Sequence, residues 1–444
     1  ELISWPVTLA ILLLAFGSLV AAGMPLLLTI LGLVASAGSL FLLTQAFDVS
    51  IWSMNFALMF ALALGIDYAL FIVARFRGAH IGSELDTREA VGVTMDTAGK
   101  AVLFSGLTVL ISLSAVLLVP SPAFRSMALG IMLSVAFVLL ATLTLLPALL
   151  ARLGDRVDRL ALPWVHAGEH RSPRFARWGE RLWGRPLLFG VPALAVLVVL
   201  ALPLLRLDTG MPSIRVVPET DGSRIGYAQI QEAFGPGAPG TLQLVGPTAD
   251  TGDATTVLET DPGIAAVAPA QRSGASALLS AVPAADPSDP AVGVTIERLR
   301  ASLPDAVLVG GAVAENHDLE QALSAKTLPV FAVVLALGFL LLLVALQAPL
   351  IAALGVLTNL LATGAAFGVG RLLFQDGHGA GLLGFESQGF LDAWAPVFFF
   401  AMIFAISMDY TVFLLASAKE HFDRSGDPRE AVVGGLAHSG RVIF

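Results

Sequence analysis

The sequence predicts a polytopic α-helical membrane protein, in which two helix bundles form a parallel repeat about a pseudo-twofold axis and one α+β domain lies outside the membrane. Composition is the first reason. Hydrophobic residues make up 56% of the 444 residues and charged residues only 13%, and the mean hydropathy is +0.82. Soluble domains carry about 25% charged residues, so this chain is too apolar to be one. Long apolar windows and an internal repeat are the other two reasons.

Apolar windows of about 20 residues are long enough to cross a bilayer. The sequence predicts five such helices in its first part, one after an Arg-rich segment, and three near its end. The nine windows are 4–21, 24–46, 52–74, 101–119, 124–150, 186–206, 327–346, 349–373 and 393–416.

Lys and Arg are unevenly distributed between the loops, and this predicts how the helices are oriented. The loop after window 52–74 holds four of them, segment 152–185 holds eight, and the chain after window 393–416 holds four. The short loops on the other side hold none. Because cytoplasmic loops are enriched in Lys and Arg, we expect the Arg-rich loops in the cytoplasm.

The long polar insert at residues 207–326 is then expected outside the membrane. It holds 6 basic and 15 acidic residues, so its net charge of −9 equals that of the whole chain. An acidic outer domain argues against nucleic acid as a partner. Short β runs alternate with helical stretches, which predicts a small α+β sandwich of β-α-β units. The expected strands are 241–245, 265–269 and 306–310, and the expected helices are 223–234, 290–303 and 315–325.

An internal repeat relates the first part of the chain to its end. Asp67 and Asp409 lie 342 residues apart, and Arg-Glu-Ala-Val recurs at 88–91 and 429–432 with an offset of 341. A helix and its charged cytoplasmic loop therefore repeat in the same orientation, which predicts a parallel repeat. Because the two halves are out of phase, we expect the parent chain to add a helix and an outer domain before Glu1 and two helices after Phe444.

The repeated helix carries an aspartate followed directly by tyrosine, inside an otherwise apolar window. A carboxylate within the membrane is expensive, so it indicates a functional site by default. The alternative is a structural role, in which the aspartate hydrogen-bonds to a neighbouring helix. A phenylalanine follows each aspartate by four residues, on nearly the same helix face. The two copies are G-I-D-Y-A-L-F, with Asp67, Tyr68 and Phe71, and S-M-D-Y-T-V-F, with Asp409, Tyr410 and Phe413.

A polar stripe marks window 101–119, where Ser105, Thr108 and Ser112 lie at positions i, i+3 and i+7. One interpretation is hydrogen bonding between helices, worth about 0.6 kcal/mol per bond. The other is a hydrated face that lends hydroxyls to a proton path beside the aspartates. The sequence leaves both open.

The remaining motifs exclude several classes of function. There is no Cys, and the seven His form no H-E-x-x-H or similar pair, so no metal site is predicted. No phosphate-binding G-x-x-x-x-G-K-[ST] loop is present. We find no catalytic constellation, so the sequence predicts a protein that is not an enzyme and needs no cofactor.

The predicted domain organisation follows from these elements. Segment 152–185 contains three Trp among its Arg, which is typical of an interfacial stretch against anionic lipid. A plain basic loop explains it equally well. The predicted domains are 1–151 (five helices and the first D-Y motif), 152–185 (cytoplasmic linker), 186–206 (one helix), 207–326 (the outer domain) and 327–444 (three helices, the second D-Y motif and the start of a further helix).

The D-Y motifs resemble a known family. The run G-I-D-Y-A-L-F-I-V-A-R-F-R at 65–77 is similar to the hallmark of MmpL-type transporters of the RND (resistance-nodulation-division) superfamily. The second D-Y helix, the R-E-A-V loop and the G-R at 440–441 match that family's second signature, although Ser407-Met408 makes the second motif looser.

The resemblance implies export of lipids or other hydrophobic molecules from a bacterial cytoplasmic membrane, driven by proton influx. It carries the role of proton relay to Asp67-Tyr68 and Asp409-Tyr410, with Phe71 and Phe413 packed beside them. Each Asp is expected to reach the Tyr hydroxyl of the other half. The implied partners are membrane lipids, a hydrophobic or lipid substrate and protons, and a homo-oligomer stays open.

Two other assignments share this helix plan. A SecD/SecF-like helper of protein export has six helices per unit and lacks the doubled D-Y-x-x-F pattern. A sterol-sensing or regulatory protein of the Patched type is expected to carry cysteine-rich outer loops, and this chain has no Cys. Both remain alternatives to the transporter.

Overall fold

The computed structural model describes residues 4–81, 85–159 and 172–443, and the chain divides into two compact units. The first unit holds most of the membrane helices and the second holds the α+β domain. The first comprises residues 1–198, 328–363 and 397–444, and the second comprises residues 199–327 and 364–396.

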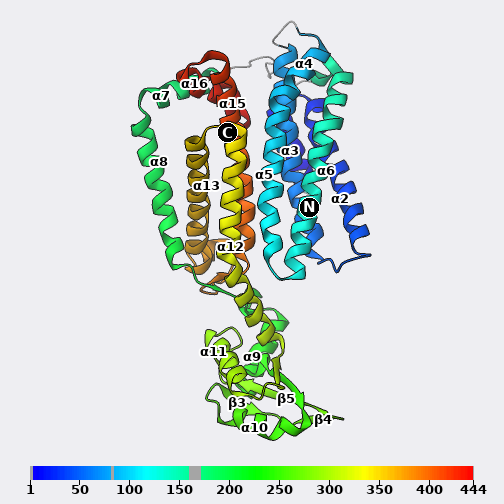
Figure 1. Cartoon of the computed structure of the whole chain (residues 1–444), viewed down its shortest axis with the longest axis vertical. Helices are drawn as coiled ribbons and strands as arrows, with labels where there is room; N and C mark the ends of the chain where they lie inside the picture. The colour runs from blue at the N-terminus through cyan, green and yellow to red at the C-terminus, as the bar shows by residue number, and fades with distance from the viewer. Residues whose placement is uncertain (1–3, 82–84, 160–171, 444) are drawn as a thin grey trace. The chain divides into compact units, whose positions relative to one another are not determined.

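The first half of the repeat forms a bundle in which α2, α3, α5 and α6 pack together, coloured blue to cyan in Figure 1. Two glycines in this bundle allow neighbouring helices to pack closely against α6. A Cβ on Gly32 of α2 would lie 2.6 Å from Val138 of α6, and one on Gly106 of α5 would lie 2.7 Å from Leu139. The helices are α1 (Ser4–Phe16), α2 (Leu19–Leu43), α3 (Trp52–Ile81), α4 (Thr87–Thr94), α5 (Lys100–Ser114) and α6 (Pro122–Leu153).

The first predicted window, 4–21, differs from the expectation. The described helix there, α1, has 13 residues, which is about 20 Å at 1.5 Å per residue and shorter than the hydrocarbon core. Gly17 ends it with a φ of +65°, a left-handed conformation that favours glycine. Ser18 then caps α2, and its hydroxyl donates to the Val157 carbonyl at 2.8 Å. The last residues of the first window therefore belong to α2, which starts five residues earlier than predicted.

Six more helices follow the first bundle, beginning with α7 in the segment between the two halves of the repeat. α7 packs on α16, where the Ser172 amide donates to the Ala437 carbonyl at 3.1 Å and Gly179 lies against the backbone of Val433. The bounds are α7 (Pro173–Gly184), α8 (Pro186–Ala201), α12 (Ala312–Leu346), α13 (Pro349–Gly370), α15 (Ala395–Ser425) and α16 (Pro428–Ile443).

Eight helices in the described ranges are long and apolar enough to cross a membrane. The chain is therefore a multi-pass membrane protein, and the predicted fold class, a polytopic α-helical membrane protein with an α+β domain, is confirmed. Eight of the nine windows coincide with these helices. They are Leu19–Leu43, Trp52–His80, Thr87–Leu118, Pro122–Asp158, Pro186–Arg206, Ala312–Leu346, Pro349–Gln375 and Ala395–Ser425.

The charged loops of the repeat also have related local structure. α4 begins at Asp86, whose carboxylate accepts from the Glu89 amide at 2.7 Å in a capping box. α16 begins after Asp427, whose carboxylate accepts from the Arg429 amide at 2.9 Å. Asp side chains at helix N-termini satisfy amides that otherwise lack partners. Each D-Y helix is thus followed by a helix that an aspartate starts.

The second unit contains a sheet with two split β-α-β units. Its strand order is β3-β5-β2-β6, with β4 on β5, and all these pairs are antiparallel. β2 and β3 therefore run parallel on either side of β5, as β5 and β6 do on either side of β2, which is the ferredoxin-like arrangement. The strands are β2 (Leu242–Pro247), β3 (Ile264–Val267), β4 (Gln271–Ser273), β5 (Ser276–Pro283) and β6 (Leu308–Gly310), and the helices are α9 (Gly222–Phe234), α10 (Thr251–Thr260) and α11 (Pro290–Ser302).

The core of this domain lies between the sheet and its helices. Leu244 of β2 and Leu279 of β5 are buried and face each other in register. Ile296 and Leu299 of α11 and Leu258 of α10 pack against them. The predicted α+β sandwich of β-α-β units is therefore confirmed. β1 (Thr209–Gly210) and β7 (Leu391–Asp392) form a separate parallel pair, and α14 (Ala380–Leu383) lies in the segment before β7.

Candidate functional site

The two D-Y helices, α3 and α15, meet through their side chains. The rings of Phe71 and Phe413 lie 4.4 Å apart between centroids. Nearer the start of each helix, Phe56 of α3 meets Phe398 of α15 at 4.9 Å. The predicted aromatic packing beside the D-Y pairs is therefore observed, and it joins the two halves of the repeat.

One carboxylate of the two D-Y pairs binds the tyrosine of the other half. The Tyr410 hydroxyl donates to Asp67 Oδ2 at 2.7 Å. The Asp67 side chain is half-buried and Tyr410 is 37% exposed. Hydrogen bonds to an ionised acceptor are roughly twice as strong as neutral ones, so this bond ties the halves together most firmly when Asp67 is charged.

The reciprocal pair is not closed. Tyr68 is completely buried and Asp409 is 1% exposed, and both are close enough to interact electrostatically. Yet within the described part of the chain neither the Tyr68 hydroxyl nor Asp409 Oδ1 has a hydrogen-bond partner. The expectation that each Asp reaches the opposite Tyr is therefore met for Asp67 and is wrong for Asp409 in this conformation.

The polar stripe of α5 lies buried in the same region. Ser105, Thr108 and Ser112 are each at most 1% exposed. Thr108 bonds its own helix through the Phe104 carbonyl at 2.8 Å, whereas the Ser105 and Ser112 hydroxyls have no partner among the described residues. Ser105 is a polar neighbour of Tyr68. The stripe therefore places the unsatisfied Ser105 hydroxyl beside Tyr68, and the unsatisfied Ser112 hydroxyl lies two turns further along α5.

Neighbouring helices hold each motif through the residue two positions before its aspartate. In the second half, Asn359 of α13 accepts hydrogen bonds from Ser407 at 2.8 Å and Thr411 at 3.0 Å. In the first half, a Cβ on Gly65 would lie 2.3 Å from the Thr29 hydroxyl of α2. Gly65 lets α2 pack closely against α3, and Ser407, at the matching position, joins α15 to α13 through a hydrogen bond instead. The looser second motif thus has a structural reason.

An ion pair joins the same two helices further along. Arg75 of α3 binds Glu420 of α15 at 2.8 Å, and Glu420 also binds Arg424 at 2.7 Å. Arg75 Nε also donates a hydrogen bond to the Thr97 hydroxyl at 3.0 Å. Sequence reasoning used only the Lys and Arg residues here, for orientation, and missed the pair with Glu420. The signal was present, because each lies on its helix beyond a D-Y motif, eight residues after Asp67 and eleven after Asp409.

The groups gathered here include carboxyl groups that can gain or lose a proton. Two carboxylates, two phenols and three hydroxyls lie on neighbouring helices, and the described residues contain no His, Cys, Asp and Glu group that could hold a metal ion. A buried charge without a hydrogen bond costs several kcal/mol, so protonation of Asp409 would remove that penalty. Gain and loss of a proton can therefore change which helix packing is favoured.

Comparisons with known proteins identify the family. A sequence model of the MMPL family matches residues 1–189 and 241–444. The mycolic acid-containing lipids exporter MmpL11 of Mycolicibacterium smegmatis is 35% identical over 99% of this chain and 48% of its own length. The putative membrane protein SCO6666 of Streptomyces coelicolor is 38% identical over the whole chain and 62% of its own length. The chain thus spans about half to two thirds of the length of these relatives.

Solved structures show a similar fold. The crystal structure of SecDF, a translocon-associated membrane protein from Thermus thermophilus, aligns with a TM-score of 0.52 at 17% identity, over 98% of this chain and 54% of that protein. At this identity the likeness concerns the arrangement of helices and the sheet domain.

Proposed function

Because this chain belongs to the MMPL family, an MmpL-type branch of the RND transporters, we propose that it exports lipids or other hydrophobic molecules from the bacterial cytoplasmic membrane, driven by proton influx. The observation that carries the proposal is the hydrogen bond from Tyr410 to Asp67, which joins the two halves of the repeat inside apolar helices. The name of the relative in M. smegmatis, an exporter of mycolic acid-containing lipids, supports a lipid substrate.

The relay works through the difference between the two D-Y pairs. In the first, the carboxylate of Asp67 accepts a hydrogen bond and is half-buried. In the second, Asp409 is fully buried and one of its oxygens has no partner in the described part of the chain. A charge is better tolerated on Asp67, so the structure suits a state with a proton on Asp409.

Loss of the proton from Asp409 reverses this preference for a charge on Asp67 rather than on Asp409. When Asp409 loses its proton, the buried Tyr68 hydroxyl, which has no partner in the described part of the chain, can stabilise the new charge, and this requires the second cross-pair to close. When Asp67 gains a proton, its bond from Tyr410 weakens. The two halves of the repeat then shift relative to each other along the Phe71–Phe413 contact. Each proton that enters releases about 2.3 kcal/mol per 100 mV of membrane potential.

Sidedness follows from the distribution of Arg. Arg75, Glu420 and Arg424 lie toward the Arg-rich end of α3 and α15, which the positive-inside rule assigns to the cytoplasm. Protons would therefore enter from the outer side, past the contact between Phe56 and Phe398, and leave to the cytoplasm past the ion pair of Arg75 and Glu420. The hydrophobic substrate would be taken up from the membrane and released through the outer domain.

The test uses the full-length protein in proteoliposomes with an imposed pH gradient and a fluorescent glycerolipid as substrate. We expect lipid transfer to an acceptor to require the gradient and to stop when a protonophore dissipates it. Proton uptake, followed with a trapped pH dye, should accompany transfer. Lipid transfer that continues at the same rate without a gradient would exclude proton-driven export.

A further inference from the structure

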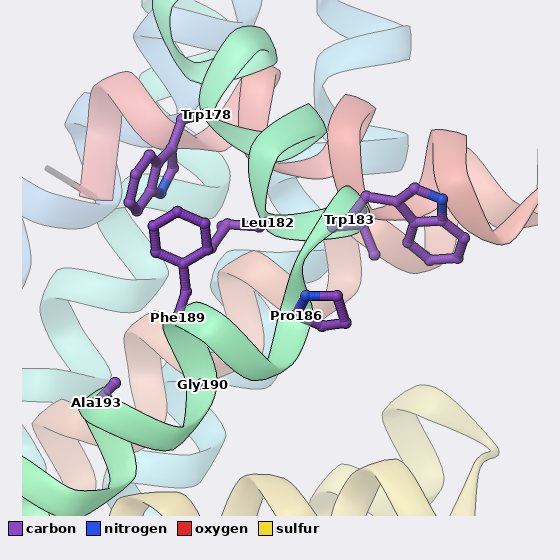
Figure 2. A pocket seen from close by; sticks show the side chains of 8 residues that line it. Trp178, Leu182, Trp183, Pro186, Phe189, Gly190 and Ala193 are labelled. Carbon is purple, nitrogen blue, oxygen red and sulfur yellow. The ribbon is translucent and has the colours of Figure 1, made fainter.

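An apolar crevice of about 850 Å³ lies between α7, the start of α8 and α16. Figure 2 shows the Trp178 and Phe189 rings next to each other in its wall, with Leu182 beside them, and the two rings are in edge-to-face contact with centroids 5.1 Å apart. Gly190 of α8 and Val432 of α16 also form part of its wall. Every residue that lines the crevice is apolar or glycine, so water is a poor occupant.

The crevice continues onto an open apolar surface. Not one residue of α8 is buried, although Pro186–Arg206 is a candidate membrane span. Leu187 and Val191, next to the crevice, are more than half exposed. A chain that fills the crevice can therefore extend along α8, as an acyl chain does along a membrane helix.

Unpaired positive charge lies beside the crevice. α7 carries Arg174, Arg177 and Arg181, and Arg185 follows at its end. The helix has one carboxylate, Glu180, which binds Arg429 at 2.8 Å. Among the residues for which the structure gives a position, none of these four arginines pairs with a carboxylate. They are exposed and available to an anion.

The spacing places charge and crevice on the same side of α7. Arg174, Trp178 and Arg181 occupy positions i, i+4 and i+7, which share one face of a helix. Arg pairs bidentately with phosphate, and Trp is enriched at the membrane–water interface. The same face therefore offers a phosphate contact above an apolar slot.

We propose that this crevice binds an anionic glycerophospholipid of the leaflet in which α7 lies, with one acyl chain between α7 and α8 and the phosphate on Arg174 and Arg181. The site is separate from the D-Y pairs and does not depend on which substrate is exported. Bound lipid would fill the space between α7 and α8 and hold α8 against the rest of the helices.

The probe is phosphatidylglycerol with brominated acyl chains, which quenches nearby tryptophan fluorescence. The full-length protein, with Trp178 and Trp183 retained and its other Trp changed to Phe, is placed in nanodiscs of phosphatidylcholine. We expect brominated phosphatidylglycerol to quench at lower mole fraction than brominated phosphatidylcholine. Arg174→Gln and Arg181→Gln should each weaken this preference about fivefold, as expected for one basic residue near an anionic surface. Arg88→Gln on α4, also exposed, is the matched control and should change nothing.

A second variant tests the crevice itself. A Cβ on Gly190 meets no atom within 4 Å, so Gly190→Leu fills the slot without disturbing the helices and should reduce quenching by both lipids. Gly23→Leu, at a similarly open position on α2, should not. Native mass spectrometry of the wild-type protein should independently retain phosphatidylglycerol. Equal quenching by the two lipids that the Arg variants leave unchanged would reduce the crevice to ordinary lipid contact. Displacement by inorganic phosphate alone would show a site for free anions. Either outcome overturns the proposal.

Discussion

Tyr410 donates a hydrogen bond to Asp67 at 2.7 Å, whereas Tyr68 makes no such bond to Asp409 within the described chain. The two pairs come from matching positions of a sequence repeat, yet one is closed and partly exposed and the other is open and buried. This asymmetry distinguishes the two D-Y motifs physically, and it predicts different consequences for equivalent substitutions.

Tyr410→Phe should destabilise the protein by about 1 kcal/mol, because it removes a hydrogen bond to a carboxylate that is partly open to solvent. Tyr68→Phe should leave thermal stability unchanged or raise it slightly, since it removes a buried hydroxyl without a partner. Transport should fall in both variants, though less than in the aspartate variants. The measurement is thermal unfolding in detergent alongside transport. A larger loss of stability in Tyr68→Phe would show that the second pair is closed in solution.

Arg75 and Glu420 should be energetically coupled across the two halves. Both side chains are about one quarter exposed, so a double-mutant cycle of Arg75→Gln and Glu420→Gln should give about 0.5–1 kcal/mol, decreasing with salt. Lys419→Gln with Asp423→Asn, an exposed pair within α15, is the control and should give less. Zero coupling at low salt would mean that the ion pair does not hold the halves together.

Gly65→Ala should impair the first motif, because the new Cβ would lie 2.3 Å from the Thr29 hydroxyl and would push α2 away from α3. We expect a destabilisation of about 1–3 kcal/mol, as for other overpacked sites, together with reduced transport. Gly23→Ala, which meets no atom within 4 Å, should be neutral or stabilising. Restoration by Thr29→Ala in the same chain would confirm the contact, and its failure would place the cause elsewhere.

The outer domain should lose stability in acid through Asp261. Hydrogen bonds from Arg298, at 2.7 Å to each carboxylate oxygen, lower the pKa of Asp261 against the opposing effect of burial, and the Gly263 amide lowers it further. A group with a lowered folded pKa stabilises the fold above its unfolded pKa of about 3.9 and loses that contribution as the pH falls through the folded value. Amide exchange in β3 and α11 should therefore rise below about pH 4. Asp261→Asn should abolish this rise in amide exchange at low pH and should raise amide exchange at neutral pH. If the variant showed the same rise below about pH 4, another group would be responsible for the loss of stability in acid.

Much of this structure could be predicted from the sequence because the length and hydropathy of an apolar window are enough to identify a membrane helix. The end of the helix in the first window could not be predicted from the sequence. It depends on the left-handed backbone at Gly17 and on the hydrogen bond from Ser18 to the Val157 carbonyl, a partner 139 residues away. Periodicity carries no information about such a partner.

In the outer domain the expected strands and two of the helices were found, and the expected helix 315–325 is the start of the longer α12, but β4, β5 and α10 were missed. β5 is rich in Ala and Ser, and α10 is rich in Thr, residues with weak preference for the structure they adopt. β5 pairs with β2, β3 and β4, so tertiary contacts make it a strand. Similarly, the repeat predicted which four residues form the D-Y site, but symmetry in sequence could not predict that only one cross-pair would close.

The central claim is that Asp67 and Asp409 carry protons, and the most direct test measures lipid transfer and proton uptake together in Asp67→Asn and Asp409→Asn. Asn keeps the size of Asp and much of its hydrogen bonding but cannot gain or lose a proton. We expect both activities to vanish in either single variant, because the two sites act as one coupled unit, while folding and membrane insertion persist. Asp409→Asn should also be at least as stable as wild type, since it removes a costly buried carboxylate. Either variant exporting lipid at near the wild-type rate would contradict the relay and leave these aspartates a role in packing.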